Sequence, residues 1–547
     1  MPRTHRLPLL AVLAVILSAG FAAVLATSAR AGTNQVTLMQ DDLHVLSDPA
    51  GTLNTFRSLG VTDVRIFIGW GSIAPSPNTR RRPSGFNAND PGAYPASNWA
   101  PYDAAVRAAA ARGMGVNFVL AGPAPLWATP PAPRGVLSRT AHDYKPSAPQ
   151  FGSFALAVGK RYSGHYTPSG SSTPLPDVKF WAIWDEPNYG FQLAPQGNNA
   201  GVEYAPYLYR NLVDQAWASL RASGHGNDTI LIGDTAPRGG NIPALANGTV
   251  PLRFLRAMYC VNSSFQQLRG QAAAVRQCPT TAAASGRFRS QNPALFNASG
   301  FAAHLYTSGQ SSRPNLGDPS NEHDYAGLVD LPNITRTLDR LQAAYGSRNH
   351  MPIYNTEFGF QTNPPKPTCG CVFLSPATAA YYLNWAEYIE WSNPRVRSDA
   401  QYLLYDAGGP PGQVKSLSGF SSGLLFYNGT PKPDFAAFQL PLYLPTTSTR
   451  SGSSLQVWGQ ARPAPYAQSD GGTPQQVEIQ FQPSKGGGWT TMSTATITNS
   501  AGYFKVPVSF PSSGSVRLQW SYPSAFAFLP AYGSPVVTSR TQAITIH

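Results

Sequence analysis

Two glutamates in this sequence stand where they could carry out acid–base chemistry. Glu186 lies in the run Phe180-Trp-Ala-Ile-Trp-Asp-Glu-Pro-Asn188, and Glu357 lies in the run Ile353-Tyr-Asn-Thr-Glu-Phe-Gly359. Cleavage of a glycosidic bond needs a carboxylic acid that protonates the leaving oxygen. It also needs a carboxylate across the anomeric carbon, about 5–5.5 Å away when configuration is retained. A single Glu in a loop is usually a solvated charge. The hypothesis that these glutamates cleave a glycosidic bond therefore depends on their occurrence as a pair.

Both glutamates follow short apolar runs that are predicted strands. Between about residues 36 and 440 such runs alternate with amphipathic helical stretches, the pattern of βα units around a parallel sheet. The order predicts an α/β fold, a (β/α)8 TIM barrel, in which the carboxyl ends of the strands build the active site. The eight predicted strands are Val36–Gln40, Asp63–Trp70, Gly115–Leu120, Val178–Trp184, Thr229–Gly233, Gly300–Tyr306, Pro352–Phe358 and Ala400–Tyr405.

Helices are predicted where apolar residues recur at three- and four-residue spacing. Long insertions rich in Gly and Pro follow strands two, three and five, at residues 71–101, 121–149 and 236–299. Because loops after the strands line the mouth of such a barrel, we expect them to determine specificity. The predicted helices are Tyr102–Arg112, Tyr204–Ala222, Ile334–Tyr345, Thr378–Trp391 and Pro433–Leu440.

In these two runs the chain resembles the clan A glycoside hydrolases, the barrel families typified by families 5 and 39. Their acid/base and nucleophile glutamates lie at the ends of strands four and seven, where this chain has Glu186 and Glu357. The resemblance covers most of residues 36–440 and includes the strand order and the separation of the two glutamates. It implies a double displacement in which Glu186 is first acid and then base, and Glu357 forms a glycosyl-enzyme.

The resemblance extends to further candidate substrate-binding residues. Arg65 matches the family's arginine near the nucleophile, although an ion pair under the barrel mouth is an alternative. His304 matches its histidine, with a hydrogen-bonded core histidine as the alternative, and Tyr306 matches its nucleophile-orienting tyrosine. Trp70 and Tyr405 stand at strand ends where these families often place an aromatic that stacks on sugar, and core packing is equally consistent with them.

Asp185 departs from the family pattern, which usually has Asn immediately before the acid/base. Asn donates a hydrogen bond to the sugar's 2-hydroxyl, whereas an ionised Asp can only accept. A second carboxylate next to Glu186 would also raise the pKa of that acid. The contact at the 2-hydroxyl, and with it the sugar bound there, therefore stays open.

A different texture follows the predicted barrel. We expect a catalytic barrel over residues 32–444, a linker over 445–454 and a β-sandwich over 455–547, because strictly alternating apolar segments begin there. The sandwich could be a carbohydrate-binding module or an Ig-like structural domain, and the structural interpretation is favoured.

The first 31 residues read as a signal peptide. Basic residues precede an apolar run from Leu7 to Ala26, and Ala29-Arg30-Ala31 suits cleavage before Gly32. We expect a secreted, extracellular protein with no stable membrane span after cleavage. An uncleaved anchor, which would hold the protein at the cell surface, is the alternative because about 20 apolar residues can cross a bilayer.

Four cysteines agree with an oxidising compartment. Pairing Cys260 with Cys278 and Cys369 with Cys371 requires the least rearrangement of the chain, although the second pair would close a strained ring. A metal site is disfavoured because Cys-x-x-Cys and matching His spacings are missing from the sequence.

Composition narrows the partners. The formal charge of +13 includes Arg3, Arg6 and Arg30, which leaves +10 on the mature chain, a charge that would attract an acidic cell-surface polymer. We expect a carbohydrate substrate, of the cell wall or another extracellular polysaccharide, and a monomer. Nucleic acid is not expected because the basic residues are scattered. We expect no cofactor and no metal, since the sequence has no Gly-x-Gly-x-x-Gly opening a helix, phosphate loop or zinc motif.

Two alternatives to a hydrolase remain. A catalytically silent sugar-binding barrel is argued against by the presence of both glutamates. A transglycosylase would use the same residues with an acceptor sugar in place of water, and its distinguishing features would lie in acceptor-site loops.

Overall fold

The computed structural model describes residues 32–133, 138–245, 247–308, 311–318, 320, 322–365, 372–407, 420–530, 532 and 534–547. The expected signal peptide, Cys369 and Cys371 lie outside these residues. Within the part of the chain that is described, none of the helices combines the length and apolarity needed to cross a bilayer.

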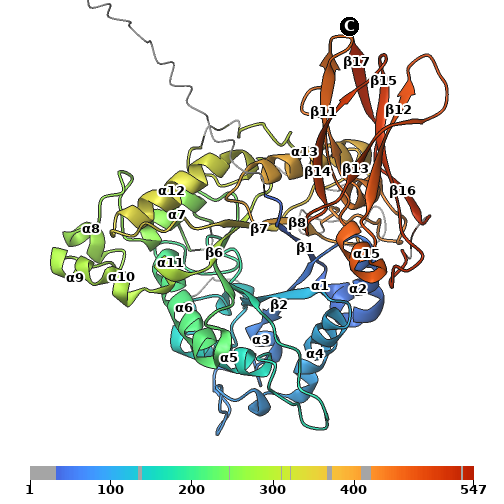
Figure 1. Ribbon diagram of the computed structural model, residues 1–547. Coiled ribbons are helices and arrows are strands. Elements are labelled where there is room, and N and C mark those ends of the chain that lie inside the picture. The colour runs from blue at the N-terminus through green and yellow to red at the C-terminus, as the bar shows by residue number, and fades with distance from the viewer. Residues whose placement is uncertain are drawn as a thin grey trace, which may run out of the picture.

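Eight parallel strands form a closed barrel, which confirms the predicted fold class (Figure 1). The sheet order is β7-β6-β5-β4-β3-β2-β1-β8, and a parallel bridge between Ile353 and Val396 joins the two ends. The strands are β1 (Val36–Gln40), β2 (Asp63–Gly69), β3 (Gly115–Ala121), β4 (Phe180–Ile183), β5 (Thr229–Thr235), β6 (Gly300–His304), β7 (Ile353–Glu357) and β8 (Ser398–Tyr402).

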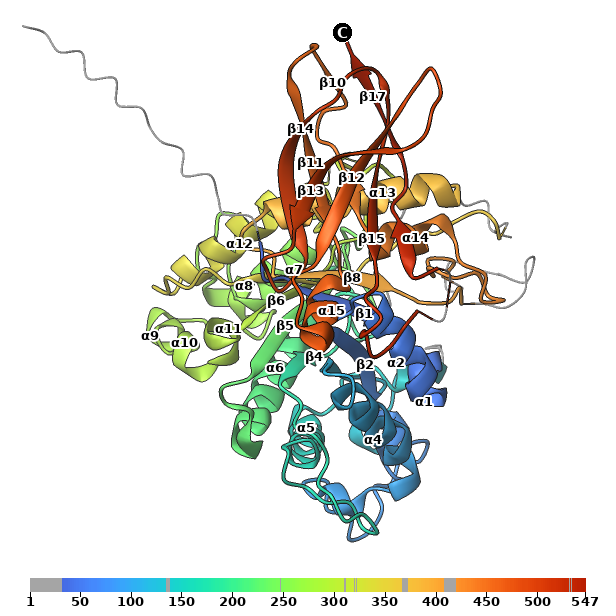
Figure 2. The same cartoon turned by 45° about the vertical axis from the view of Figure 1, so that its right-hand side comes forward.

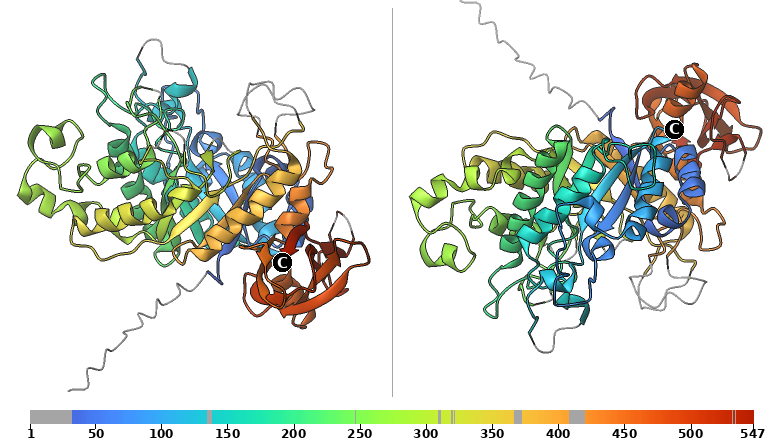
Figure 3. Two further views of the ribbon diagram at one scale, coloured as in Figure 1. Left: turned by 90° about the horizontal axis from the view of Figure 1, so that it is seen from above. Right: turned by 90° about the horizontal axis from the view of Figure 1, so that it is seen from below.

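Helices surround the barrel (Figure 3). Five predicted strands end one to three residues earlier than expected. Among the residues left out, Trp70 begins a short helix and Tyr405 lies in the loop after β8. The helices are α1 (Asp42–Ser47), α2 (Pro49–Ser58), α3 (Trp70–Ile73), α4 (Ala96–Ala110), α5 (Ala148–Arg161), α6 (Ala205–Leu220), α7 (Pro251–Met258), α8 (Gly270–Ala274), α9 (Ala282–Gly286), α10 (Phe288–Gln291), α11 (Ala294–Asn297), α12 (Leu331–Ala343), α13 (Pro376–Ser392), α14 (Pro433–Gln439) and α15 (Ala464–Gly471).

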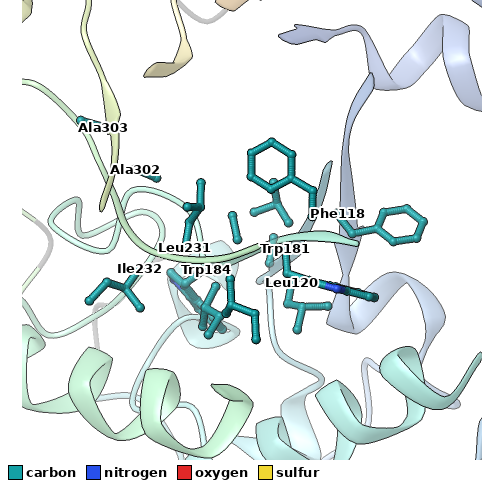
Figure 4. Close-up of a cluster of buried hydrophobic side chains, with 14 of the residues drawn as sticks. Phe118, Leu120, Trp181, Trp184, Leu231, Ile232, Ala302 and Ala303 are labelled. Carbon is teal, nitrogen blue, oxygen red and sulfur yellow. The ribbon is translucent and has the colours of Figure 1, made fainter. Parts of the chain in front are cut away.

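The main hydrophobic core lies between the strands and these helices. Figure 4 shows part of it, with Trp184 and Ile232 on the side of the strands that faces the helices. Trp181 and Trp184 are both fully buried, and Trp184 packs edge-on against Phe151 of α5. Large aromatic side chains of this kind bury much apolar area and fix the end of β4, where the candidate acid follows.

The longest of the three insertions, between β5 and β6, is compact rather than open. Helices α7 to α11 lie between β5 and β6, and a disulfide joins Cys260 to Cys278, as predicted. Both cysteines are buried, and the Arg210 guanidinium of α6 contacts Cys260 Sγ at 3.2 Å. The disulfide therefore cross-links the insertion internally, and Arg210 connects it to α6 of the barrel.

The C-terminal residues form a β-sandwich, as predicted (Figure 2). Its hydrogen bonding begins at Leu442, earlier than the expected boundary, and the expected linker contributes Ser448–Thr449 as a strand paired with the last one. The strands are β9 (Leu442–Tyr443), β10 (Ser448–Thr449), β11 (Ser454–Gln460), β12 (Gln476–Pro483), β13 (Thr490–Thr496), β14 (Tyr503–Ser509), β15 (Gly514–Ser521), β16 (Val536–Thr538) and β17 (Gln542–Ile546).

The sandwich packs firmly against the barrel. Trp458 and Tyr503 of the sandwich are buried in a cluster with Tyr388 and Trp391 of α13. The buried Arg462 donates hydrogen bonds of 2.7 Å to Glu387 and to Asp399, both in the barrel. Contacts of this extent favour a structural role for the sandwich.

Candidate active site

Glu186 lies just after β4, in a backbone that turns sharply. Trp184 and Glu186 have positive φ values of 68° and 38°, which are uncommon for residues with a side chain. The Glu186 amide donates a 2.9 Å hydrogen bond to the carbonyl of Asp234, at the end of β5. This bond directs the Glu186 side chain into a cluster of charged groups at the mouth of the barrel.

Glu357 is the last residue of β7 and is buried, with 8% of its surface exposed. Its Oε1 accepts a 2.7 Å hydrogen bond from the Arg65 guanidinium, and its Oε2 accepts one of 3.2 Å from the Tyr306 hydroxyl. Both donors stabilise the ionised form of a carboxyl group. Tyr306 itself stays neutral, because burial and the Glu357 charge raise its pKa well above 10.

His304, the last residue of β6, lies between the two glutamates. Its Nδ1 is 2.9 Å from Glu186 Oε1 and 3.5 Å from Glu357 Oε2, and its Nε2 is 3.3 Å from Asp234 Oδ1. Burial lowers the pKa of this imidazole, but Glu357, Asp234 and Glu186 together raise it well above its usual value. Since both ring nitrogens face carboxyl oxygens, we assign His304 as an imidazolium that donates on both sides.

The contacts of His304 also limit how far apart the two glutamates can be. The sum of its distances to Glu186 Oε1 and Glu357 Oε2, 6.4 Å, is an upper limit on the separation of these two oxygens. The two carboxyl groups are therefore close neighbours at the same His304 ring nitrogen.

The two glutamates have different environments. Burial raises the pKa of Glu186, and the hydrogen bond and charge of His304 only partly counter this effect. About a fifth of the Glu186 side chain is exposed, whereas that of Glu357 is half as exposed and has Arg65 beside it. Burial thus helps Glu186 to hold a proton, whereas Glu357 has a guanidinium and a phenol directed at its oxygens.

Arg65 of β2 is the central cation of the cluster and has no exposed surface. Besides Glu357, its guanidinium donates 2.7 Å to Asp234 Oδ2, 3.4 Å to Asp185 Oδ1, and to Gln40 Oε1. Burial would lower its pKa, but Asp234, Glu357 and Asp185 raise it above the usual arginine value. Arg65 is thus a permanent positive charge among the carboxyl groups.

Asp185 is buried against the same guanidinium. Its Oδ2 accepts a 3.0 Å hydrogen bond from the side-chain amide of Gln192, in the loop after β4. Burial, followed by repulsion from Glu357, raises the pKa of Asp185 well above the usual range for aspartate. A protonated Asp185 could donate a hydrogen bond as Asn does, whereas the ionised Asp expected from the sequence could only accept one.

Trp70 and Tyr405 are not brought to the charged cluster by any contact in the described structure. Trp70 is fully buried and packs against Trp127, Phe151 and Phe154, which is the core-packing alternative. Tyr405 is partly exposed; its ring lies 4.2 Å from the ring of His44, and its hydroxyl is 2.9 Å from that of Tyr532 in the sandwich.

Two site residues were missed by sequence reasoning. Asp234 is the next-to-last residue of β5. It is 1% exposed, and its carboxyl group contacts both Arg65 and His304. Tyr402 ends β8, and burial and the charge of Glu357 raise its pKa well above 10. A signal for Asp234 was present, since it is a polar residue directly after a predicted strand, whereas Tyr402 falls in the middle of the predicted strand Ala400–Tyr405.

Asp185, His304 and Glu357 offer donor atoms within 4.8 Å of one another, as the ligands of a metal ion do. Arg65 already donates to both of these carboxyl groups, and His304 is held protonated. A metal ion would have to displace one cation and deprotonate the other. The cluster therefore suits acid–base chemistry better than metal binding.

No protein-family model matches this chain, and no curated protein does either. Among solved structures, it is similar to a family 39 glycoside hydrolase from Bacteroides cellulosilyticus WH2, with 12% identity and a TM-score of 0.42 over 87% of this chain and 80% of that one. It is also similar to a glucosidase from Croceicoccus marinus, with 11% identity and a TM-score of 0.46 over 87% and 94%. An endo-β-1,4-mannanase from Thermotoga petrophila has 10% identity and a TM-score of 0.39 over 94% and 98%. The assignment of the barrel rests on the strand order itself.

Proposed function

We propose that this protein is a secreted, retaining glycoside hydrolase in which Glu186 is the acid/base and Glu357 is the nucleophile. The observation that carries the proposal is the upper limit of 6.4 Å between their carboxyl oxygens. An inverting pair is separated by about 6.5–9.5 Å to leave room for a water molecule, whereas a retaining pair is about 5–5.5 Å apart. The limit supports direct attack on the sugar by one carboxylate.

The roles follow from the two environments. Glu186, whose pKa is raised by burial, holds the proton that the leaving oxygen takes. Glu357, with hydrogen bonds from Arg65 and Tyr306, attacks the anomeric carbon and forms a glycosyl ester. Glu186 then removes a proton from water, which attacks the ester and releases the sugar with its original configuration.

The surrounding residues suit a carbohydrate substrate. Asp185 lies beside both glutamates, and we assign it a hydrogen bond to a hydroxyl of the sugar attacked by Glu357. The basic mature chain and the signal-like N-terminus support action outside the cell on a polysaccharide, with no cofactor.

A panel of 2-fluoroglycosides with good leaving groups tests this proposal. These reagents slow hydrolysis of the glycosyl ester, so we expect one sugar to label the protein and the label to map to the peptide that contains Glu357. Glu357→Gln is the control and should stay unlabelled. Turnover of an aryl glycoside with and without added acceptor sugars would distinguish a hydrolase from a transglycosylase. No label and no turnover with any sugar would favour a silent sugar-binding barrel.

A further inference from the structure

Asp234 touches both halves of the candidate machinery without being exposed to a substrate. Its carbonyl accepts the amide hydrogen of Glu186 at 2.9 Å, and its Oδ2 accepts from Arg65 at 2.7 Å. Its Oδ1 lies 2.6 Å from the Thr356 hydroxyl and 3.3 Å from His304 Nε2. Thr356 directly precedes Glu357, so every contact of Asp234 leads to one of the two glutamates.

The backbone of Asp234 is held in an uncommon conformation. Its φ is +48°, and the preceding Gly233 has φ +106° and donates its amide hydrogen to the Tyr209 hydroxyl at 2.7 Å. Residues other than Gly are uncommon in this region and persist there only where the surrounding structure holds them. The bend lets one residue present its carbonyl to Glu186 and its carboxylate to Arg65 and His304.

The charges at the site keep Asp234 ionised. Four carboxyl groups, from Asp185, Glu186, Asp234 and Glu357, surround two cations, Arg65 and His304. Burial would raise the pKa of Asp234, but Arg65 and His304 outweigh burial and lower it, so Asp234 is ionised. Asp185 and Glu357 also contact both cations, but Asp234 is the least exposed of the four carboxyl groups, at 1%.

We propose that Asp234 is a positioning residue that keeps His304 protonated on both nitrogens and holds Arg65 in place. His304 then faces Glu186, and Arg65 faces Glu357. This inference rests on the proposed function for the catalytic roles of the two glutamates. The contacts of Asp234 themselves are independent of those roles. Asp234 accepts from His304 Nε2, and this leaves Nδ1–H to donate to Glu186. Through Arg65 and Thr356 the same carboxylate sets the position of Glu357.

Asp234→Asn tests the proposal because it keeps the size of the side chain but introduces an N–H donor. If the amide nitrogen faces His304 Nε2, two donors meet, and if it faces Arg65, the clash is with the guanidinium. In both orientations the negative charge beside the imidazole is lost, so the imidazole should lose its Nε2 proton. We expect kcat on an aryl glycoside to fall about 10- to 100-fold, with KM within about threefold, which is the scale of a small misplacement of catalytic groups.

Asp399→Asn is a matched control. Asp399 is equally buried and accepts from an arginine, Arg462, at 2.7 Å and from a threonine hydroxyl, Thr37, at 3.0 Å, but it lies at the contact with the sandwich. Both variants should lower the melting temperature, whereas only Asp234→Asn should lower kcat. An equal effect of the two on kcat would overturn the positioning role.

The His304 titration separates this inference from the proposed function, because it needs no substrate. In protein with ¹⁵N-labelled histidine, with the His304 signal assigned from a His304→Asn variant, we expect an imidazolium at pH 7 in the wild type. In Asp234→Asn we expect the neutral Nδ1–H form. If His304 in Asp234→Asn titrates as it does in the wild type, the inference is rejected. If the substitution changes the His304 titration in a protein that cleaves no glycoside, only the proposed function is rejected.

Thr356→Val keeps the question decidable if Asp234→Asn does not fold. It removes only the 2.6 Å hydrogen bond to Asp234 Oδ1. We expect kcat to fall about three- to tenfold with KM unchanged, in keeping with the loss of one hydrogen bond to a charged group. An unchanged kcat in a folded Thr356→Val protein would contradict the proposal.

Discussion

His304 Nδ1 lies 2.9 Å from Glu186 Oε1, so the candidate acid shares a short hydrogen bond with a buried imidazolium. Burial raises the pKa of Glu186, and the positive charge of His304 works in the opposite direction. His304→Gln should therefore raise the pKa of Glu186 further. Because the acid must be protonated, the alkaline limb of kcat/KM should move upward by about one pH unit, which corresponds to about 1.4 kcal/mol. A limb that stays in place or moves downward would contradict this assignment.

Glu186→Ala should affect substrates according to their leaving groups. A dinitrophenyl leaving group needs no proton, so its release should stay close to the wild-type rate, whereas a glycoside of an alkyl alcohol should lose about 10²- to 10⁴-fold. Azide should then attack the glycosyl ester and restore turnover as a glycosyl azide. The measurement is the rate on both substrates with and without azide. Equal losses on both, without rescue, would indicate a structural role for Glu186.

Much of the barrel could be predicted because its strands are short, buried and apolar. Predicted Val36–Gln40 coincides with β1, and the predicted β7 run differs from the observed strand by one residue at each end. The predicted strand ends were wrong where a residue that suits a strand also suits the segment that follows it. Trp70 continues the apolar pattern of β2 but begins α3, because its indole packs against Phe151 and Phe154.

The candidate site was predictable only in part. The glutamates, Arg65 and His304 stand in recognisable runs, whereas Asp234 has no such run around it. Its importance arises from contacts with Arg65 and with Thr356, which are 169 and 122 positions away in the sequence. The raised pKa of Asp185 likewise depends on burial that a single sequence does not reveal.

Asp185→Asn should be nearly silent near neutral pH. Burial and Glu357 raise the pKa of Asp185 well above its usual value, so the substitution replaces one neutral group by another. The Gln192 amide, 3.0 Å away, can rotate to present its oxygen to the new N–H. We expect kcat/KM at pH 6 to stay within about threefold, whereas Asp185→Ala should lose about 1–2 kcal/mol with the hydrogen bond. A loss of tenfold or more in Asp185→Asn would mean that the ionised carboxylate is used.

Glu357→Gln should abolish turnover while the barrel stays folded. The amide oxygen can still accept from Arg65 or Tyr306, so packing at the end of β7 is kept, but the nucleophile is lost. The checks are activity, which should fall by at least about 10⁴-fold, and the melting temperature, which should change by only a few degrees. Substantial residual activity in pure protein would remove Glu357 from the role of nucleophile.

The contact between the barrel and the sandwich should contribute to the free energy of unfolding. Arg462 of the sandwich is fully buried and is the cation for Glu387 and Asp399 of the barrel. Arg462→Met leaves two buried carboxyl groups without it, and breaking a buried pair in this way costs about 3–5 kcal/mol of the free energy of unfolding.

The loss in Arg462→Met should depend on pH. Burial raises the pKa of Glu387 to about 7 even with Arg462 present, and removal of the arginine should raise it further. A carboxyl group whose pKa is higher in the folded than in the unfolded protein destabilises the fold as pH rises above its unfolded value. Urea unfolding should therefore show a smaller loss at pH 5 than at pH 8. Arg517→Met, in which the lost guanidinium contacts Gln480 and the Trp489 ring, should cost less than about 1 kcal/mol at both values. An equal loss in the two variants, or a loss in Arg462→Met that does not change with pH, would show that Arg462 does not carry the contact between the domains.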